Sequence, residues 1–360
     1  MTSLFDPITF GAIHAPNRIM MAPLTRGRAT HKHVPTPLMG EYYSQRASAG
    51  LIISEATGIS QQGLGWPCAP GLWSDEQVDA WRPIVQAVHA AGGRIVAQLW
   101  HMGRLVHPDY LGGAQPVSAS ATTAPGHAHT YEGTKPYAES RALEAHEIKG
   151  IIGDYKRAAE HAIAAGFDGV QLHAANGYFI DQFLRDGTNR RTDSYGGAVE
   201  NRIRLLTEVT QAVIGAAGAD RTGVRLSPND DAQGCGDSEA ETLFTKAAEA
   251  LNGLGIAFLE MRASRPESTF RPATRQLVPA IRRAFKGALI LNSDYLLDDA
   301  SLALSLGEAD AIAFGRPFLA NPDLPVRFAK RAPLNPPDPK TFYTPGPSGY
   351  TDYPPYVGEE

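Results

Sequence analysis

The feature that most constrains the fold is a repeated alternation of short apolar runs with longer amphipathic runs. The short runs have the continuous apolar character of strands buried in a parallel sheet: Ile19–Ala22, Leu51–Ser54, Ile95–Leu99, Gly169–Leu172, Gly223–Leu226, Ala257–Met261, Ala288–Leu291 and Ala311–Phe314. The longer runs predict helices near Pro37–Ala47, Glu76–Ala91, Glu147–Ala165, Val199–Ala216, Ser238–Leu251, Ala273–Phe285, Asp298–Leu306 and Leu324–Lys330. Eight such units favour an α/β fold of the (β/α)8 TIM barrel type over an open doubly wound sheet. No GxGxxG fingerprint opens the first unit, which argues against a Rossmann domain.

Several glycines stand in the predicted helix-to-strand turns, where a helix C-cap favours glycine: Gly50, Gly92, Gly93, Gly166, Gly255 and Gly307. Three segments fall outside the alternation. Residues 8–14 predict a small hairpin that plugs one barrel end, and residues 103–142, rich in glycine and proline, predict a lid insertion after the third strand, with packing decoration as the alternative. Residues 332–360 hold eight prolines and four tyrosines and predict an extended arm over this site or another subunit. We expect one domain over residues 1–360.

The composition argues against several functional classes. Hydrophobic residues make up 43% and charged residues 20% of the chain, which suits a globular protein with a large core. The net charge of −5 gives no basic footprint for nucleic acid. Cys68 and Cys235 form no metal-type pair, and two cysteines are too few to hold an iron–sulfur cluster. The sequence has neither a basic leader nor a run of 18 apolar residues, so we expect a cytoplasmic protein without a membrane span.

Polar side chains crowd the end of the fourth predicted strand. The run Gly169–Leu172 leads into His173, and Asn176 and Tyr178 follow before a helix-like segment at Phe179–Leu184. In a TIM barrel, the carboxyl ends of the strands form the catalytic rim. An imidazole, an amide and a phenol placed together can bind an oxygen and deliver a proton to a neighbouring atom. His173 alone is more often a structural histidine or a metal ligand, but no carboxylate stands at metal-ligand spacing.

Other strand ends carry groups that suit a bound ring. Thr25 offers a hydroxyl after the first strand, with a turn or cap role as the alternative. In the third strand, a buried Gln98 needs hydrogen-bond partners such as a pyrimidine offers, and Trp100 either walls a site or packs in the core. Arg225 in the fifth strand needs an anion, a dense set of acceptors or a buried ion pair.

The ends of the seventh and eighth strands suit a phosphate. Asn292 and Ser293 end the seventh strand, and Gly315 and Arg316 end the eighth. TIM barrels often bind phosphate at this place, on backbone amides and the N-terminus of a short helix. Gly315 allows close approach of the backbone, and Arg316 supplies positive charge. Asp294 would repel a phosphate, so we expect its side chain to point away.

Together these motifs resemble the old yellow enzyme family of FMN-dependent ene reductases over nearly the whole chain. The resemblance includes Pro23-Leu24-Thr25, Gln98, His173-Ala-Ala-Asn176-Gly-Tyr178, the run from Gln182 to Gly197, Glu200-Asn201-Arg202, Arg225 and the run from Phe314 to Leu324. The chain is similar to the bacterial cyclohexenone and nitro-ester reductase branch, and it lacks the cysteine cluster of the longer iron–sulfur relatives.

The resemblance implies an NAD(P)H-dependent enzyme that reduces the activated C=C bond of α,β-unsaturated ketones, aldehydes, imides or nitroalkenes. It implies hydride transfer from flavin N5 to the β-carbon, oxygen binding by His173 and Asn176, and proton donation by Tyr178 to the α-carbon. It implies cofactor contacts from Pro23, Leu24, Thr25, Ala56, Gln98, Arg225, Asn292, Ser293, Gly315 and Arg316. It implies pocket walls at Trp66, Trp100, Phe270 and Tyr343. Relatives often carry glycine at position 293. NADPH or NADH would be the electron donor, and the protein would be a monomer or homodimer.

Two other functions remain open on the residues alone. A barrel aldolase or lyase needs a lysine on a strand or a carboxylate metal site. Four lysines fall in predicted helices or at their ends: Lys149, Lys156, Lys246 and Lys286. A barrel that only binds flavin or a phenol keeps Arg225 but has no need of Tyr178. A visible spectrum, and its bleaching by NAD(P)H, distinguishes the three.

Overall fold

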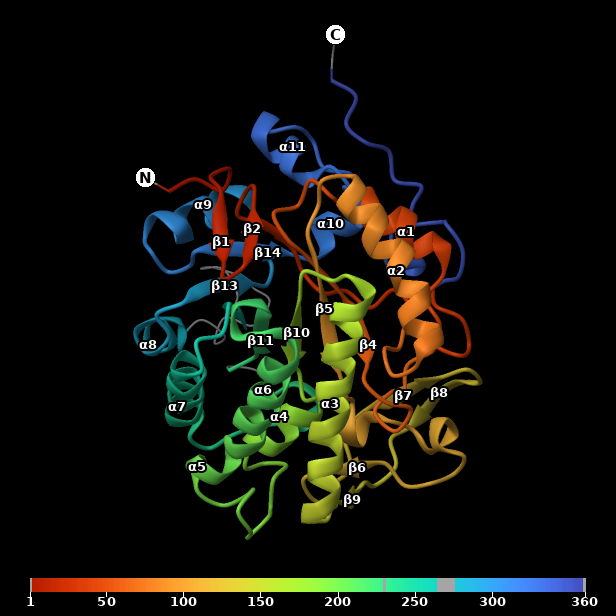
Figure 1. Ribbon diagram of the computed structural model, residues 1–360, viewed down its shortest axis with the longest axis vertical. Coiled ribbons are helices and arrows are strands. Elements are labelled where there is room, and N and C mark those ends of the chain that lie inside the picture. Colours follow the sequence, from red (N-terminus) through yellow and green to blue (C-terminus); the bar gives the residue numbers. More distant parts are fainter. Residues whose placement is uncertain (1, 229–230, 264–275, 359–360) are drawn as a thin grey trace.

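The chain forms a closed barrel of parallel strands surrounded by helices (Figure 1). The computed structural model describes residues 2–228, 231–263 and 276–358. The eight barrel strands follow one another around the barrel in chain order, and the last pairs with the first. They are β3 (Ile19–Met21), β4 (Ile52–Gly58), β5 (Ile95–Trp100), β10 (Gly169–His173), β11 (Thr222–Leu226), β12 (Phe258–Arg262), β13 (Ala288–Asn292) and β14 (Ala311–Phe314). The predicted TIM barrel is confirmed.

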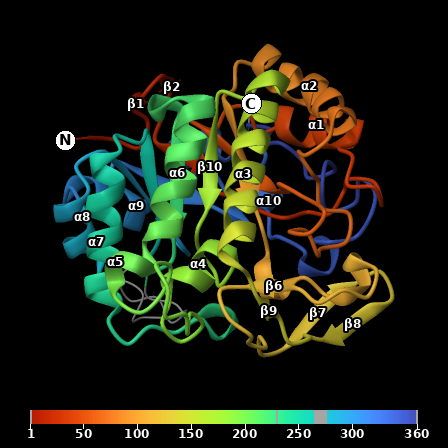
Figure 2. The same ribbon diagram turned by 60° about the horizontal axis from the view of Figure 1, so that its bottom comes forward.

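Amphipathic helices cover the outside of the barrel, and α2, α3, α6 and α7 are seen there in Figures 1 and 2. The helices are α1 (Pro37–Ser44), α2 (Asp75–Ala90), α3 (Ala145–Ala165), α4 (Phe179–Leu184), α5 (Val199–Arg202), α6 (Arg204–Ala217), α7 (Ala240–Gly253), α8 (Val278–Ala284), α9 (Leu297–Ser305), α10 (Arg316–Ala320) and α11 (Leu324–Lys330). Local signals set their ends. Ser74 accepts a hydrogen bond from the Gln77 backbone N–H and caps α2, while Gly166 ends α3 at a φ of 98°.

Three of the differences from the sequence predictions concern a helix break, a strand end and a glycine turn. The helix predicted at Val199–Ala216 is two helices, because Ile203 forms a turn between α5 and α6. Strand β4 runs on to Gly58 through a register shift against β5, whereas the prediction ended it at Ser54. Gly50 is not a left-handed C-cap: a Cβ there would meet the Asn17 carbonyl oxygen at 2.1 Å, so close backbone approach explains the glycine.

An N-terminal hairpin lies against the amino end of the barrel. Its strands β1 (Ile8–Phe10) and β2 (Ile13–Ala15) pair antiparallel. Phe10 is fully buried and packs edge-to-face on Phe258 at the start of β12, with ring centroids 5.6 Å apart. The hairpin therefore shares one hydrophobic cluster with the barrel interior at the amino end of the strands.

The segment between β5 and α3 forms a separate layer at the carboxyl end of the barrel (Figure 2). It contains two short 3-10 turns and the strands β6 (Val117–Ser118), β7 (His127–Thr130), β8 (Gly133–Pro136) and β9 (Arg141–Ala142). Strand β6 pairs with β9, and β7 forms a hairpin with β8. His129 of this hairpin packs on Trp66 with ring centroids 4.6 Å apart, so the layer reaches the barrel rim.

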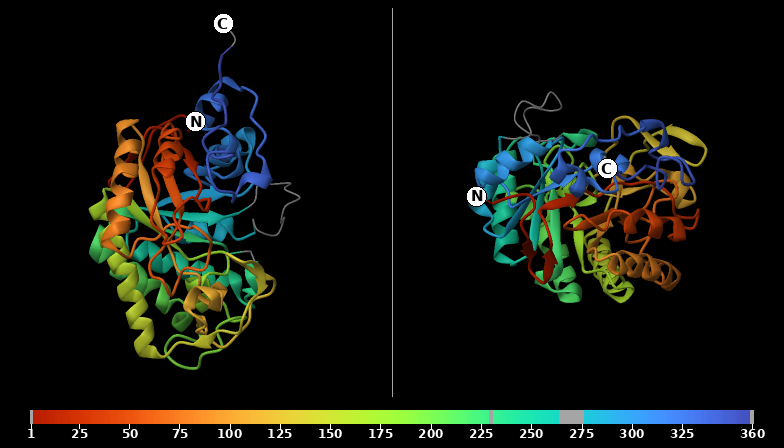
Figure 3. Two further views of the ribbon diagram at one scale, coloured as in Figure 1. Left: turned by 90° about the vertical axis from the view of Figure 1, so that its right-hand side faces the viewer. Right: turned by 90° about the horizontal axis from the view of Figure 1, so that it is seen from above.

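The C-terminal arm, blue in Figure 3, folds back on its own barrel. Arg26 Nη2 donates to the Gly349 carbonyl at 2.7 Å, and Arg28 Nη1 donates to the Phe342 carbonyl at 2.7 Å. Tyr350 is fully buried and stacks on Tyr42, with ring centroids 4.0 Å apart. Two arginines from the loop after β3 therefore hold the arm against its own barrel, one of the two places that its composition allowed.

Candidate active site

Two of the three residues singled out at the fourth strand, His173 and Tyr178, are in contact at the barrel rim, and Asn176 lines the neighbouring cavity. His173 is the last residue of β10, and Tyr178 directly precedes α4. Their rings meet edge-to-face with centroids 4.8 Å apart, and Tyr178 also packs edge-to-face on Trp100 at 4.9 Å. Asn176 lies between them in the chain with a φ of 61°, a left-handed conformation that asparagine tolerates better than most residues.

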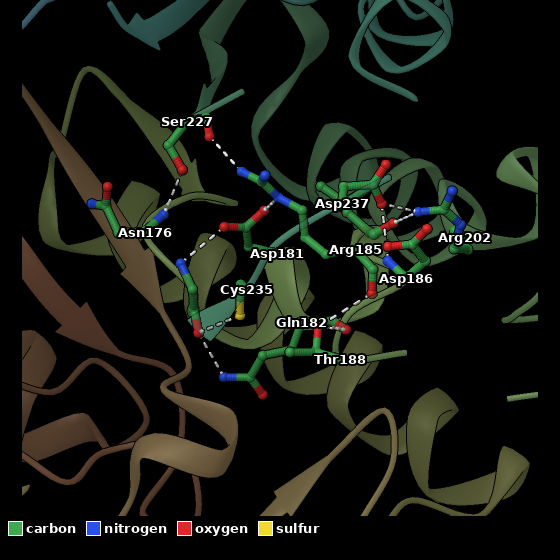
Figure 4. A network of polar contacts seen from close by, with 12 residues as sticks. Asn176, Asp181, Gln182, Arg185, Asp186, Thr188, Arg202, Ser227, Cys235 and Asp237 are labelled. Carbon is green, nitrogen blue, oxygen red and sulfur yellow. Dashed lines mark hydrogen bonds and ion pairs between the residues drawn. The ribbon is translucent and has the colours of Figure 1, made fainter. Parts of the chain in front are cut away.

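A buried polar network holds the loop that carries these residues (Figure 4). Ser227 Oγ accepts from the Asn176 backbone N–H at 2.7 Å. Asp181 accepts from the Gly177 N–H at 2.8 Å and from Arg185 Nε at 2.9 Å. Arg185 in turn donates to the Ser227 carbonyl at 2.5 Å. This closed set of contacts fixes the loop before any ligand binds, which is what a preorganised site requires.

His173 is electronically suited to donate a hydrogen bond as a neutral ring. Burial, and then the nearby Arg225 and Arg262 guanidiniums, hold its pKa well below its usual value. Its Nδ1 atom is buried and has no hydrogen-bond partner among the described residues. A neutral imidazole carries one N–H donor, so His173 can offer it to a ligand oxygen without being protonated.

Tyr178 keeps its proton at neutral pH. Burial raises the pKa of its phenol above the usual value, and the neighbouring Tyr137 and Tyr343 add to the shift. The phenol is therefore available as a proton donor rather than as a phenolate.

A chain of polar contacts crosses the barrel interior near the carboxyl end of the strands. Gln98 Nε2 donates to Gln171 Oε1 at 2.7 Å, and Gln171 Nε2 donates to Glu260 Oε2 at 2.7 Å. Arg225 Nε lies 3.0 Å from Glu260 Oε1 without hydrogen-bond alignment, and Arg225 Nη2 donates to Asn292 Oδ1 at 2.8 Å. The buried ion pair considered as one explanation for Arg225 is thus present, and the partner of the Gln98 amide is another glutamine.

A cavity of about 540 Å³ opens above this chain. It is lined by Leu24, Asn176, Arg225, Arg262, Asn292, Ser293, Gly315 and Arg316, among others. Ser293 has a φ of 120° and Asp294 a φ of 61°. Asp294, expected to point away, lines the same cavity, and its carboxylate accepts from Arg316 Nη2 at 3.2 Å. That expectation is wrong, because the carboxylate pairs with the guanidinium proposed to hold the phosphate.

A second cavity, of about 270 Å³, lies under the aromatic residues of the rim. Its walls include Pro23, Leu24, Thr25, Trp66, Trp100, Tyr178, Arg316 and Tyr343. Leu24 and Arg316 line both cavities, so the two adjoin. Ala56 and Gln98 are buried in β4 and β5 and line neither cavity. Phe270 lies outside the described residues.

These cavities fit a flavin mononucleotide. The lining offers two guanidiniums, at Arg225 and Arg316, for a ring edge and a phosphate. Buried Trp100 Nε1 has no hydrogen-bond partner among the described residues, as expected of a group that a bound ligand would satisfy. The barrel strands contain no lysine, so they offer no amine for the Schiff base that an aldolase or lyase needs.

Three polar residues of the site were missed by the sequence analysis: Gln171, Glu260 and Arg262. Alternate residues of a strand face the same side. Gln171 stands two residues before His173 in β10, and Glu260 two before Arg262 in β12. That period of two could have placed all three on the inside of the barrel.

The described residues contain no group of three or more His, Cys, Asp or Glu side chains placed to bind a metal. None of their helices combines the length and apolar character of a membrane span.

Barrel, cavity and rim together place this protein among the flavin-dependent TIM-barrel oxidoreductases. Residues 3–335 match the NADH:flavin oxidoreductase / NADH oxidase family. The structure superposes on an old yellow enzyme homologue from Zymomonas mobilis with a TM-score of 0.95 and 62% identity, covering 98% of this chain and 99% of that one. It superposes on morphinone reductase in complex with tetrahydroNAD with a TM-score of 0.94 and 46% identity, covering 99% and 98%. In sequence it is 42% identical to 12-oxophytodienoate reductase 2 from Arabidopsis thaliana, over 98% of this chain and 95% of that protein.

The chain belongs to the NADH:flavin oxidoreductase / NADH oxidase family, the old yellow enzyme family. The predictions of an FMN-dependent oxidoreductase, of a nicotinamide electron donor and of ene reduction as the general reaction are thereby confirmed. The roles of individual residues remain predictions.

Proposed function

We propose that this protein reduces the activated C=C bond of α,β-unsaturated ketones, aldehydes, imides or nitroalkenes, with His173 and Asn176 binding the substrate oxygen and Tyr178 donating the proton. The observation that carries the proposal is the contact of His173 with Tyr178, ring centroids 4.8 Å apart, beside a loop that buried contacts fix and whose Asn176 lines the adjoining cavity. FMN, when bound, supplies a hydride from N5 to the substrate β-carbon.

His173 and Asn176 would act as a pair of donors to one oxygen. As the β-carbon gains a hydride, negative charge grows on the carbonyl or nitro oxygen. Two fixed donors in a buried site stabilise that charge as an oxyanion hole does, and losing one donor typically lowers the rate by ~10²–10³. The lowered pKa of His173 supports this role, because a neutral ring keeps its tautomer and its donor over the working pH range.

Tyr178 would protonate the α-carbon. Its raised pKa keeps the phenol protonated, and the enolate carbon is basic enough to accept the proton. The contacts with Trp100 and His173 hold its ring over the second cavity.

Cofactor binding is assigned to the residues that line or underlie the cavities. Arg225 would face the pyrimidine N1–O2 edge and stabilise negative charge there, and Thr25 would hydrogen-bond the O4 region. Ring contacts are further assigned to Pro23, Leu24, Ala56 and Gln98. The phosphate is assigned to Ser293, Gly315 and Arg316, next to Asn292. Trp66, Trp100 and Tyr343 would wall the substrate pocket.

Separate measurement of the two half-reactions tests the proton donor. Tyr178→Phe should leave FMN reduction by NAD(P)H unchanged and slow reoxidation by 2-cyclohexenone by ~10²–10⁴, the usual range for a lost general acid. Reoxidation by a nitroalkene should slow less, because solvent can protonate its anion. Stopped-flow flavin absorbance follows both steps. Equal slowing of reduction and reoxidation would remove Tyr178 from this role.

The control is Tyr155→Phe. Tyr155 is a fully buried tyrosine of α3 whose hydroxyl has no hydrogen-bond partner among the described residues. Both half-reactions should keep their wild-type rates in this variant.

The same experiment distinguishes the rival functions. A lyase would show no oxidised-flavin band in the visible spectrum, and a mere flavin binder would not be bleached by NAD(P)H and recoloured by the enone.

A further inference from the structure

We propose that Arg262 is a positioning residue that orients the Asn176 amide so that its N–H groups face the substrate oxygen. The inference rests on the proposed function, because it assigns the reason why Asn176 can act there as a donor. It concerns the last residue of β12, a strand separated from β10 by β11, and both Arg262 and Asn176 line the same cavity.

The evidence is one short contact. Arg262 Nη1 donates to Asn176 Oδ1 at 2.5 Å. A guanidinium has five donors and no acceptor, so only the carbonyl oxygen of the amide can face it. The contact therefore settles a choice that amide geometry leaves open, since the oxygen and nitrogen of an asparagine side chain are nearly the same size.

The Asn176 main chain cannot adjust to a different orientation. Its N–H is bound by Ser227 Oγ at 2.7 Å, and its φ of 61° lies in a narrow left-handed well. Only rotation of the amide group itself remains, and Arg262 opposes it. The Nδ2 hydrogens are thereby left for a ligand in the cavity that Asn176 lines.

Arg262 stays a cation while it does this. Burial, and then the field of Arg225, lower its pKa to about 10, and Glu260 opposes that shift. At neutral pH the side chain is protonated, so it remains a pure donor.

Two substitutions separate orientation from mere contact. Arg262→Gln can hydrogen-bond Asn176 in either orientation, because a carboxamide both donates and accepts, and so it loses the selection. Arg262→Lys keeps a side chain that only donates. We expect Arg262→Gln to raise the Kd of 4-hydroxybenzaldehyde, whose phenolate oxygen needs both donors, by about 10–100-fold, the range for losing a hydrogen bond to a charged group. Arg262→Lys should bind 4-hydroxybenzaldehyde with a Kd close to that of the wild type.

The Kd is measured by titrating the flavin absorbance of the holoprotein, without turnover. The effect of Arg262→Gln should vanish in an Asn176→Ala background, because the residue through which it acts is absent. If Arg262→Gln does not fold, Arg262→Met carries the same expectation in both backgrounds.

A wild-type Kd in Arg262→Gln, or an equal loss in the Asn176→Ala background, would overturn this inference alone. A wild-type protein that neither titrates the phenol nor reduces the enone would overturn the proposed function, and the inference with it.

Discussion

The barrel interior has a lower half, at the amino end of the strands beside the hairpin, and an upper half, at the carboxyl end of the strands. Opposite kinds of contact fill the two halves. The lower half is apolar: the hairpin places Phe10 against Phe258, and the cluster continues through Met20, Ile53 and Val96, all buried. Its stability comes from removing apolar surface from water and from close packing. Such an interior depends on volume and shape, and it needs no particular partner for any one atom.

The upper half, within the same eight strands, is a chain of amides and charges. Gln98, Gln171, Glu260, Arg225 and Asn292 are all buried there, and each depends on a specific neighbour. A buried ion pair is weak evidence for stability, because desolvation opposes the attraction. The comparison teaches that the barrel gains stability at one end and keeps costly polar groups at the end where a ligand can use them.

Backbone conformation follows the same division. Asn176, Ser293 and Asp294 have positive φ, and all three follow the carboxyl ends of β10 and β13. Strained residues of this kind cost about 1–3 kcal/mol each and cluster at functional sites.

The largest expected effect on stability comes from a substitution in the apolar half. Phe10→Ala should lower the free energy of unfolding by about 3–5 kcal/mol, the usual range for a buried phenylalanine, because the hairpin then leaves a cavity under the barrel. The folded fraction should keep its wild-type kcat. Chemical denaturation and steady-state kinetics measure the two quantities.

Phe5→Ala is the matched control. This side chain comes from the same N-terminal segment but is 43% exposed, so its removal should change stability little. A loss of kcat in Phe10→Ala with unchanged stability would contradict the division of the barrel into two halves.

Much of this division could be predicted from the sequence. Continuous apolar runs are typical of buried parallel strands, and all eight predicted strands are present. His173, Asn176 and Tyr178 were predictable at one place on the barrel rim because the end of one strand and the loop after it carry all three. Helix α11 at Leu324–Lys330 matches its predicted bounds.

The polar partners could not be predicted, because they depend on register between strands that are distant in the chain. Glu260 reaches Arg225 because β11 and β12 pair these two residues directly. Likewise, the period of two suggests that Arg262 faces inward, but only the closed barrel brings it to Asn176, 86 positions away. The arm presents the same difficulty: its proline and tyrosine content indicates an extended segment, whereas Arg26 and Arg28 decide where it lies.

A smaller effect is expected from weakening the polar half. Glu260→Gln keeps the shape and the contact with Gln171 but removes the charge 3.0 Å from Arg225 Nε. We expect the free energy of unfolding to fall by about 3 kcal/mol, the low end of the range for removing one partner of a buried ion pair, because Asn292 still accepts from Arg225. If Arg225 faces the flavin as proposed, its charge is then less neutralised and the flavin reduction potential should rise. Chemical denaturation measures the free energy of unfolding, and titration in equilibrium with a redox dye measures the flavin reduction potential.

The control for this variant is Asp310→Asn. Asp310 pairs with Arg282 at 2.7 Å, at the amino end of β14. This substitution should lower stability slightly and leave the potential unchanged. A Glu260→Gln protein with a wild-type potential would show that the upper chain of contacts is structural only.

The smallest effect concerns strain, and it should be favourable. Ser293 adopts a φ of 120°, a region that suits glycine rather than serine. Ser293→Gly should therefore raise the free energy of unfolding by about 1 kcal/mol, measured on protein stripped of flavin so that ligand binding does not contribute. Ser301→Gly, in the interior of α9 on an exposed face, is the opposite case and should lower stability by roughly 0.5–1 kcal/mol. If both glycines destabilise the protein, Ser293 carries no releasable strain, and the upper half differs from the lower half in its polar groups alone.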